Sequence, residues 1–261
     1  MKSQSNANKI AWSYRAYEHW VRYSGPPDQA AARMRDDPAS FLRQDLSYLG
    51  NVEGKRVINL LGSNGRKAVP LSLLGADVTV IDISPEGARY ALELADAAGV
   101  RINYLITDIA DLPVQELANS FDLAYMEGGV FHYFADLSHI AQIIHAILSP
   151  GGRLVASDFH PIGKCLSVGD GHVVSTGNYF DEQFHDSDVA FQRFFPDEEQ
   201  SDFPKCQLRY WTLGEIVTAF AHAGLTIEQL VELPHPQLAD IPGQFTLTAT
   251  KPGIDGLAIS R

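Results

Sequence analysis

The sequence predicts an α/β fold built around a parallel, doubly wound sheet. From Lys55 to Ser157, short apolar runs alternate with segments of helical periodicity. The apolar runs are typical of strands buried on both faces, and Gly or Pro residues close the helical segments. Strands joined by helices cross over with a right-handed sense and form parallel sheets, so this alternation indicates the fold class.

The expected elements follow one another in order. We expect strands at residues 57–61, 77–81, 101–106, 121–126 and 153–157. We expect helices at residues 67–74, 85–98 and 137–148. Ser84 is predicted as the N-cap of the second of these helices, with Pro85 at its first position.

Helical segments precede this region. An opening helix is expected to carry five aromatic side chains, namely Trp12, Tyr14, Tyr17, Trp20 and Tyr23. The run Gly25-Pro26-Pro27 is expected to end it, because proline cannot continue a helix. A second helix is predicted at about residues 41–49, where Leu recurs at helical spacing.

Residues 159–209 break the alternation. This segment is too long for a simple connection, and we expect a lid or cap made of strands and loops. Its acidic part, residues 181–202, is expected to be a solvated loop over packed phenylalanines, or these rings line an apolar substrate pocket. The phenylalanines are Phe180, Phe184, Phe191, Phe194 and Phe195.

The C-terminal part returns to helix and strand. A helix is expected from Thr212 to Ala223, followed by strands at 225–232 and 244–250. These strands are expected to be joined through Pro234, Pro236 and Pro242. The tail after Lys251 is expected to be disordered.

The composition excludes several classes of protein. The 261 residues contain 20 Lys+Arg and 32 Asp+Glu, a formal net charge of −12, which argues against a dedicated nucleic-acid binder. The acidity suits a small-molecule ligand, especially a cationic one, or serves only solubility. Two Cys exclude a disulfide framework and a Cys-based zinc site, and the His spacings do not indicate a metal. With no signal-peptide pattern and no long apolar run, we expect a cytoplasmic protein.

Polar residues follow three consecutive expected strands. They are the turn Asn59 to Gly65, Asp82 and Asp108. Open α/β sheets bind ligands at this edge, where one carboxylate can accept bonds from a ribose diol and another from an adenine amino group. Each Asp could instead cap the next helix. The turn lacks the G-x-G-x-x-G spacing, the P-loop Lys-Ser/Thr pair and the nucleophile elbow, which would need Gly in place of Leu61.

These pieces together resemble the class I S-adenosylmethionine-dependent methyltransferases. The resemblance covers residues 50–158 and, more loosely, residues 210–250. It rests on the turn and the two Asp residues, on Phe121-Asp122-Leu123, on residues 148–154 and on residues 210–215 leading to 223–225. Asn59 stands where this family usually has an acidic residue, and Ser63-Asn64 fill its Gly-rich loop.

The resemblance implies a Rossmann-like, seven-stranded sheet that is mostly parallel with an antiparallel last strand. It implies a helical lid at residues 1–50, a cofactor-binding core at 51–158 and a substrate cap at 159–209. Residues 210–250 would complete the core sheet, and 251–261 would form the tail.

The resemblance also assigns the cofactor, S-adenosyl-L-methionine, to particular residues. Its methionine and ribose part would lie against Asn59, Gly62, Ser63 and Asn64. Asp82 and Ile83 would bind the ribose, and Asp108 and Ile109 the adenine. Met126 and Glu127 would flank the sulfonium, and Tyr14 and Tyr17 would close over the site unless they form an aromatic core stripe.

The expected reaction is transfer of a methyl group to N or O of a small, aromatic or heteroaromatic molecule. Such in-line displacement needs alignment and exclusion of water rather than a protein nucleophile. If a base takes part, His160, His132, Tyr14 and Glu127 are the candidates, although loop histidines are usually structural.

Two other functions stay open at this point. They are an NAD-dependent oxidoreductase and a non-catalytic module that binds the cofactor or a partner. We expect no nucleic-acid or membrane partner, and a monomer or homodimer.

Overall fold

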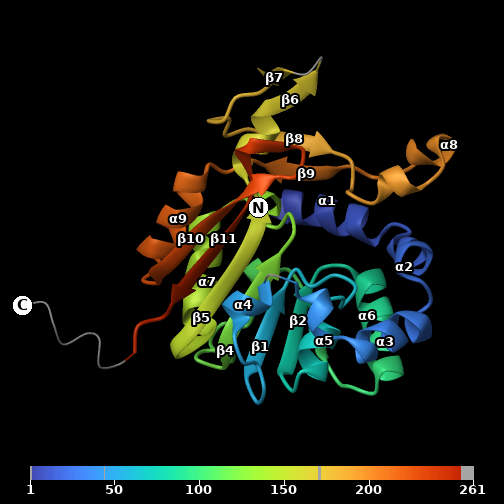
Figure 1. The fold of residues 1–261 in the computed structure, drawn as a ribbon, viewed down its shortest axis with the longest axis vertical. Coiled ribbons are helices and arrows are strands. Elements are labelled where there is room, and N and C mark those ends of the chain that lie inside the picture. The colour runs from blue at the N-terminus through green and yellow to red at the C-terminus, as the bar shows by residue number, and fades with distance from the viewer. Residues whose placement is uncertain (1, 44, 170–171, 254–261) are drawn as a thin grey trace, which may run out of the picture.

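A seven-stranded sheet forms the centre of the protein. The computed structural model describes residues 2–43, 45–169 and 172–253, and the predicted tail falls largely outside the described residues. The sheet has the order β10-β11-β5-β4-β1-β2-β3 (Figure 1). Its strands are β1 (Arg56–Leu60), β2 (Asp77–Asp82), β3 (Asn103–Ile106), β4 (Phe121–Glu127), β5 (Leu148–Phe159), β10 (Thr226–His235) and β11 (Leu238–Thr250).

The strand directions confirm the predicted fold class. The pairs from β3 to β5 are all parallel. The last strand, β11, runs antiparallel to both of its neighbours, β5 and β10. The carboxyl ends of β1 to β4 therefore meet along one edge of the sheet.

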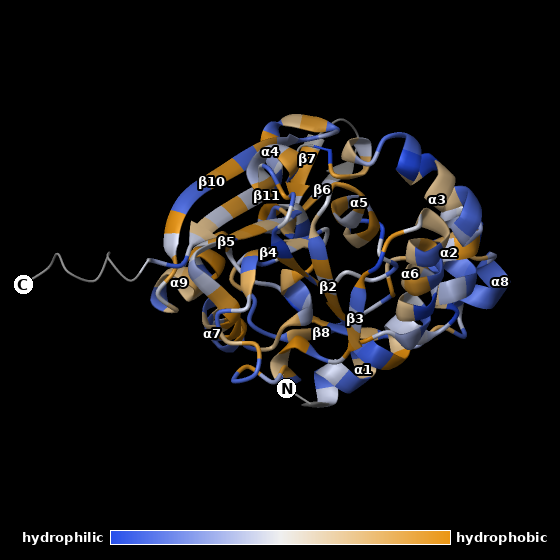
Figure 2. Cartoon of the chain, turned by 90° about the horizontal axis from the view of Figure 1, so that it is seen from below, coloured by the Kyte–Doolittle hydropathy of each residue, from blue (hydrophilic) through white to orange (hydrophobic). Residues whose placement is uncertain are grey.

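Helices cover both faces of the sheet because its central strands are apolar on both sides (Figure 2). Ile58 and Leu60 of β1 pack with α7 (Leu137–Ile147) and α9 (Leu213–His222). Val57 and Tyr125 lie in the opposite cluster, with α4 (Asp45–Leu49) and α5 (Ala68–Leu73). This double burial explains the continuous apolar runs of the sequence.

The helix after β2 begins as predicted. In α6 (Pro85–Ala98), Ser84 is the N-cap, and its hydroxyl accepts a hydrogen bond from the Gly87 N–H at 3.1 Å. Gly99 closes the helix at φ 76°. The cap and the left-handed glycine satisfy backbone groups that the helix itself leaves free.

The N-terminal segment differs from the expected pair of helices. The opening helix is split into α1 (Lys2–Ser13) and α2 (Ala16–Ser24), with Arg15 between them at φ 54°. Its guanidinium bonds to Glu18 and Glu199, which holds this left-handed turn. Pro27 begins a further helix, α3 (Pro27–Asp36), since proline suits a first helical position.

Residues 161–209 form short elements around two hairpins. In chain order they are η4 (Pro161–Cys165), β6 (Leu166–Gly169), β7 (His172–Ser175), β8 (Phe184–Ser187), η5 (Gln192–Phe194), α8 (Asp197–Gln200) and β9 (Cys206–Arg209). Strand β9 packs beside α1 over the sheet edge (Figure 1). Phe191 and Phe195 are buried as expected, whereas Phe180, Phe184 and Phe194 are about half exposed or more, so the prediction of five packed rings was wrong.

The C-terminal strands are longer than predicted. β10 and β11 form one hairpin, in which Pro234 pairs with Pro242 next to a shift of register. The connection is therefore shorter than expected, because Pro234 and Pro242 lie inside the strands and only Pro236 lies between them. A proline is tolerated in a ladder at such an irregularity, because the missing N–H is not needed there.

Candidate functional site

A cavity of about 310 Å³ lies at the carboxyl edge of the sheet. Its floor consists of the ends of β1 to β4, and its roof consists of α1, α2 and the segment around η5. The floor residues are Asn59, Leu61, Gly62, Ser63, Asn64, Arg66, Lys67, Ile81, Asp82, Ile83, Thr107, Asp108, Ile109, Glu127, Gly128, Gly129 and Val130. The roof and wall residues are Ser5, Asn8, Trp12, His19, Trp20, Tyr23, Ser24, Tyr133, Phe134, Ala190, Phe191, Arg193 and Phe194.

The loop after β1 is held in an unusual conformation. Leu61 and Ser63 lie at φ 51° and 47°, in the left-handed region that L-residues rarely adopt. A Cβ on Gly62 would come within 2.6 Å of Asn59 Oδ1 and of Val80 Cγ1. Only glycine fits this position, and the loop therefore brings bare backbone to the cavity.

Asn59 leaves an acceptor unused beneath this loop. Its side chain is 2% exposed, and its Nδ2 donates to Tyr125 O at 3.3 Å. Its Oδ1 has no hydrogen-bond partner among the described residues. A buried acceptor without a partner costs about 1–3 kcal/mol, so a ligand donor at this point would be favoured.

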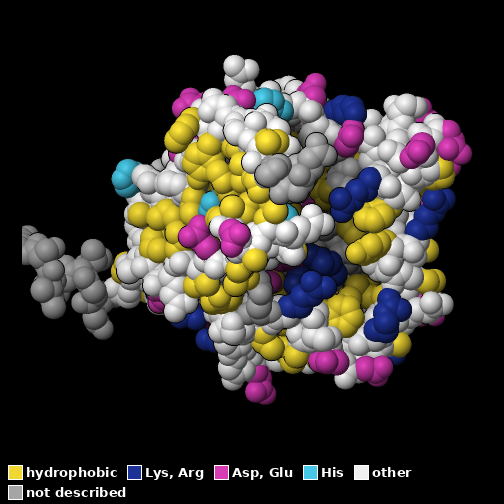
Figure 3. All heavy atoms as spheres, turned by 45° about the horizontal axis from the view of Figure 1, so that its top comes forward, with side chains coloured by type: hydrophobic (Ala, Val, Ile, Leu, Met, Phe, Trp, Pro, Cys, Tyr) yellow, Lys and Arg dark blue, Asp and Glu magenta, His cyan; other side chains and the backbone are white. Residues whose placement is uncertain are grey.

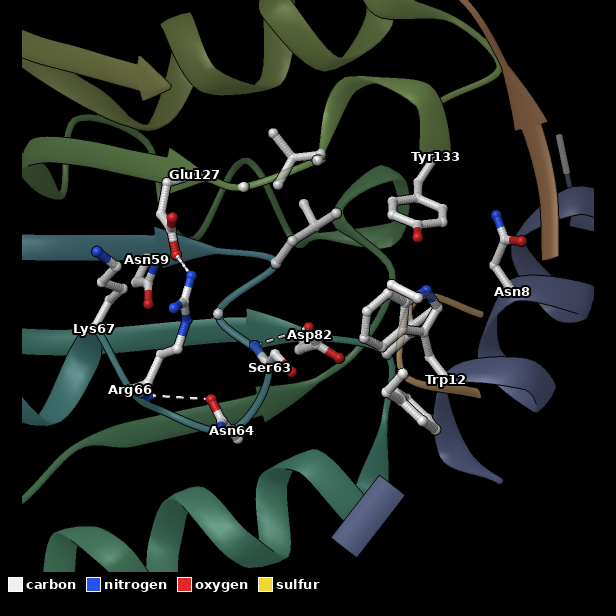
Figure 4. A pocket seen from close by; sticks show the side chains of 18 of the residues that line it. Asn8, Trp12, Asn59, Ser63, Asn64, Arg66, Lys67, Asp82, Glu127 and Tyr133 are labelled. Carbon is white, nitrogen blue, oxygen red and sulfur yellow. Dashed lines mark hydrogen bonds and ion pairs between the residues drawn. The ribbon is translucent and has the colours of Figure 1, made fainter. Parts of the chain in front are cut away.

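Asp82 ends β2 and points to the loop. Its carboxylate accepts a hydrogen bond from Ser63 N at 3.0 Å (Figure 4) and another from Ser84 N at 2.8 Å. Burial nevertheless raises the pKa of Asp82 to about 6, because the backbone bonds offset only part of the desolvation. The group is thus ready to gain further hydrogen-bond donors.

Asp108 both caps a turn and lines the cavity. Its Oδ1 accepts from Ala110 N at 2.8 Å, at the start of η2 (Ile109–Asp111). Its Oδ2 accepts a hydrogen bond from the Ser5 hydroxyl of α1. The N-terminal helix is therefore bonded directly to the strand edge that it covers.

Two basic residues follow the loop. Arg66 forms an ion pair with Glu127 at the end of β4, and its backbone N–H donates to Asn64 Oδ1 at 3.3 Å (Figure 4). Lys67 is buried, donates to Phe41 O at 2.8 Å and lies 3.7 Å from Asp45. Burial lowers the pKa of Lys67.

Aromatic rings form the wall opposite this pair. Trp12 meets Tyr133 and Phe191 edge to face, with ring centroids 5.7 and 5.4 Å apart. His19 stacks on Phe191 at 4.8 Å and on Phe194 at 5.4 Å. Burial lowers the pKa of His19 to about 4, so the imidazole is neutral at neutral pH. Figure 4 shows Trp12 and Tyr133 across the cavity from Glu127 and Arg66.

The structure brings most of the predicted cofactor residues together and places three predicted residues elsewhere. Met126 lies within the core of the sheet and does not line the cavity. Tyr14 packs on Phe203 with ring centroids 4.9 Å apart. The hydroxyl of Tyr17 donates to Glu93 on α6. Tyr14 thus joins a largely aromatic cluster, and Tyr17 joins a mainly aliphatic one that contains Tyr90.

The two predicted histidines also lie outside the cavity lining. Burial lowers the pKa of His132 to about 3. His160 Nε2 lies 2.8 Å from Glu232 Oε1, and its Nδ1 accepts from Ile162 N at 3.2 Å. The Nδ1 of His160 is thus used within the chain, whereas its Nε2 faces the Glu232 carboxylate without the geometry of a hydrogen bond.

Sequence reasoning missed Asn8, His19 and Arg193. Each comes from a segment far from the sheet edge in sequence, and only tertiary packing brings it to the cavity. The sequence could have indicated Arg66 and Lys67 as site residues, because they directly follow the loop after β1. No group of three or more His, Cys, Asp or Glu suited to a metal occurs in the described part of the chain.

Comparison with known proteins shows which proteins this chain resembles in sequence. Residues 61–156 match the model of a family described as "Methyltransferase domain". Demethylmenaquinone methyltransferase of Thermus thermophilus is 32% identical over 112 residues, which are 42% of this chain and 50% of that protein. Ubiquinone biosynthesis O-methyltransferase of Xanthomonas axonopodis pv. citri is 31% identical over 118 residues, 44% of this chain and 48% of that one. The chain thus spans about half the length of these curated relatives.

The fold has solved counterparts. An S-adenosylmethionine-dependent methyltransferase from Mesorhizobium loti superimposes with a TM-score of 0.62 at 23% identity. The match covers 83% of this chain and 99% of the other. At this identity the likeness shows the fold alone. In the described residues, no helix has the length and apolar character to cross a membrane.

Proposed function

We propose that this chain, in which residues 61–156 match a methyltransferase domain, is a class I S-adenosylmethionine-dependent methyltransferase that transfers a methyl group to a nitrogen or oxygen atom of a small aromatic or heteroaromatic molecule. The single observation that carries this proposal is the row of polar groups at the ends of β1, β2 and β3. These polar groups line the same cavity as the loop after β1, which requires glycine at position 62. Open α/β sheets bind nucleotide-like ligands at this edge.

The residues present fit the cofactor. The unpartnered Asn59 Oδ1 is an acceptor for an ammonium or hydroxyl group, and Gly62 leaves room where a Cβ would collide. In our proposal Gly62, Ser63 and Asn64 hold the methionine and ribose part. Glu127, with its partner Arg66, borders the region of the reacting sulfur.

The adenosine end is assigned to the next two strands. Asp82 accepts bonds from the ribose hydroxyls, with Ile83 beside it. Asp108 and Ile109 hold the adenine. All four residues line the cavity. The carboxylates suit this role, because hydroxyl and amino groups donate hydrogen bonds and the Asp oxygens accept them.

The mechanism depends on alignment and on a dry site. Bound S-adenosylmethionine supplies an electrophilic methyl group on its sulfonium. The chain contributes walls that hold the acceptor in line and exclude water, which removes much of the entropic barrier. The bond from Ser5 to Asp108 and the aromatic roof close the cavity. Accordingly we propose residues 1–50 as a lid and 159–209 as a cap over the core of 51–158 and 210–250.

No protein base is required where the accepting atom is an unprotonated nitrogen or an ionised oxygen, whereas a neutral hydroxyl must release its proton, and Glu127 is the candidate base that lines the cavity. Tyr14, His132 and His160 do not line the cavity, and in this proposal they take no part in the displacement. The aromatic wall favours a flat acceptor, because stacked or edge-on rings gain more than buried area alone supplies. The proposed acceptor is a small molecule of the cytoplasm, and the proposed active species is a monomer or homodimer.

Calorimetric titration with S-adenosylhomocysteine tests the proposal, with NAD as the competing ligand. We expect micromolar binding of the former, as is usual for a cofactor product, and none of NAD. Asp82→Ala should abolish this binding. Asp77→Ala at the exposed, opposite end of β2 should not affect it. Binding of NAD alone would favour an oxidoreductase, and binding without turnover of any aromatic acceptor would favour a non-catalytic module.

A further inference from the structure

The cationic side chains of the cavity are not equally neutralised. Arg66 is paired with Glu127, and Lys67 is held by Phe41 O with Asp45 nearby. Arg193 also lines the cavity and has no ion-pair partner among the described residues. This is notable in a chain with a net charge of −12, where carboxylates outnumber bases.

Arg193 sits within the aromatic wall. It belongs to η5, between Phe191 and Phe194, and its guanidinium lies 5.0 Å from the Phe194 ring centroid. Both phenylalanines stack on His19 of α2. The guanidinium is exposed, so it is free to turn toward a ligand that enters between these rings.

His19 is a second polar group without a partner. Its side chain is 3% exposed, it lines the cavity, and its ring forms no hydrogen bond within the described residues. A neutral imidazole carries one N–H donor. The ring nitrogens of His19 are not among the fully enclosed atoms without a partner, so this donor can be reached from the cavity and is suited to a ligand's oxygen atom.

The face of the molecule drawn in Figure 3 also combines basic and apolar side chains. Figure 3 shows Lys and Arg side chains gathered in and beside a hollow, with hydrophobic side chains next to them. A cationic ligand, which the overall acidity favours, would be repelled there. An anionic ligand would gain a charge-assisted bond, and an aromatic one would gain stacking.

We infer that the acceptor is a planar aromatic molecule that carries a carboxylate, with the carboxylate bound by Arg193 and the ring placed among Trp20, Tyr23 and Phe194. The inference rests on the proposed function, since it names the class of acceptor for the same site. Arginine suits this role because its planar fork matches a carboxylate with two parallel hydrogen bonds. His19 supplies a further N–H donor at the same wall.

Two matched probes test the inference on the full chain loaded with S-adenosylhomocysteine. They are 4-hydroxybenzoate and 4-hydroxybenzamide, which share the ring and the hydroxyl and differ in charge. We expect the wild type to bind the acid at least about tenfold more tightly than the amide. Arg193→Gln should reduce this preference to less than about twofold, with unchanged binding of S-adenosylhomocysteine. Arg101→Gln, an exposed arginine before β3 and outside the cavity, should keep the full preference.

Each other outcome overturns the inference. Equal binding of the two probes, tighter binding of the amide, or binding of neither would show that the wall does not select aromatic acids. An unchanged preference in Arg193→Gln would remove Arg193 from recognition. The cofactor titration is made first on the same sample. If S-adenosylhomocysteine does not bind, the proposed function is refuted. Titration of both probes into the protein without S-adenosylhomocysteine would then still measure whether the cavity prefers the acid to the amide.

Discussion

Asn8 and Gln207 are joined by reciprocal hydrogen bonds although 199 residues separate them. Asn8 Nδ2 donates to Gln207 O at 3.1 Å, and Asn8 Oδ1 accepts from Gln207 N at 2.7 Å. The pair ties α1 to β9 and so couples the N-terminal segment to the segment of residues 159–209. Asn8 is itself 2% exposed and lines the cavity.

Asn8→Ala should loosen the roof of the cavity. The backbone N–H of Gln207 would lose its partner, which costs about 1–3 kcal/mol, while Gln207 O would keep the hydrogen bond that it accepts from Gln4 Nε2 at 3.0 Å. We expect faster amide hydrogen exchange in α1 and β9 and weaker binding of S-adenosylhomocysteine, with little change in β1 to β4. Asn8→Asp is the matched variant, since it keeps the acceptor and loses only the donor, and its effect should be intermediate. Equal exchange in all three proteins would mean that this pair does not couple the two segments.

The fold was predictable because its signal is local. Runs such as Val57 to Leu60 are buried on both faces, and that burial is visible as continuous apolarity. The break at Arg15 was not predictable, since its left-handed turn depends on Glu199 far along the chain. The residues of the cavity floor could be predicted, because they lie where the predicted strands end. The residues of the roof could not, because they are placed by long-range contacts such as that of Asn8 with Gln207.

The histidines show the same difference between what local sequence predicts and what tertiary packing decides. His160 follows β5, and the strand pattern of the sequence predicts a substrate pocket there. In the structure, however, its ring is turned to Glu232. His19 lies in an aromatic-rich helix and carried no chemical signal of its own. Only the packing of Phe191 and Phe194 against it reveals a buried imidazole at the cavity. Side-chain direction within a loop or helix is a tertiary property, and residue order does not specify it.

Gly62→Ala should damage the loop after β1. The new Cβ would lie 2.6 Å from Asn59 Oδ1 and from Val80 Cγ1, and neither side chain can retreat from its buried place. We expect a loss of about 1–3 kcal/mol in unfolding free energy and at least about tenfold weaker binding of S-adenosylhomocysteine. Thermal denaturation and calorimetry measure the two effects. Gly163→Ala is the control, since nothing lies within 4 Å of its Cβ. An unimpaired Gly62→Ala would contradict the tight fit.

Cofactor binding should depend on the ionisation of Asp82. Burial raises its pKa to about 6, so the free protein binds a proton there as the pH falls through that value. Ribose hydroxyls donate hydrogen bonds and prefer the ionised carboxylate, so affinity should fall by up to about tenfold per pH unit below the pKa. Calorimetric titration from about pH 8 to about pH 5 measures this slope. Asp82→Asn should bind weakly at every pH, and a wild type without any slope would exclude Asp82 from ribose binding.

His19 should also leave a signature in the pH dependence of stability. Its pKa is lowered from 6.5 to about 4 by burial, so between these values the unfolded chain binds a proton that the folded chain does not. Stability must therefore fall as the pH drops through this window, by about 3 kcal/mol at most. His19→Phe keeps the stacking on Phe191 and Phe194 and removes the titrating group, so its denaturation midpoint should fall less between neutral and acid pH. The comparison isolates His19, because His132, whose pKa is lowered to about 3, contributes equally to both proteins. Parallel loss of stability in the two proteins would mean that the imidazole of His19 titrates normally, as in an open and hydrated roof.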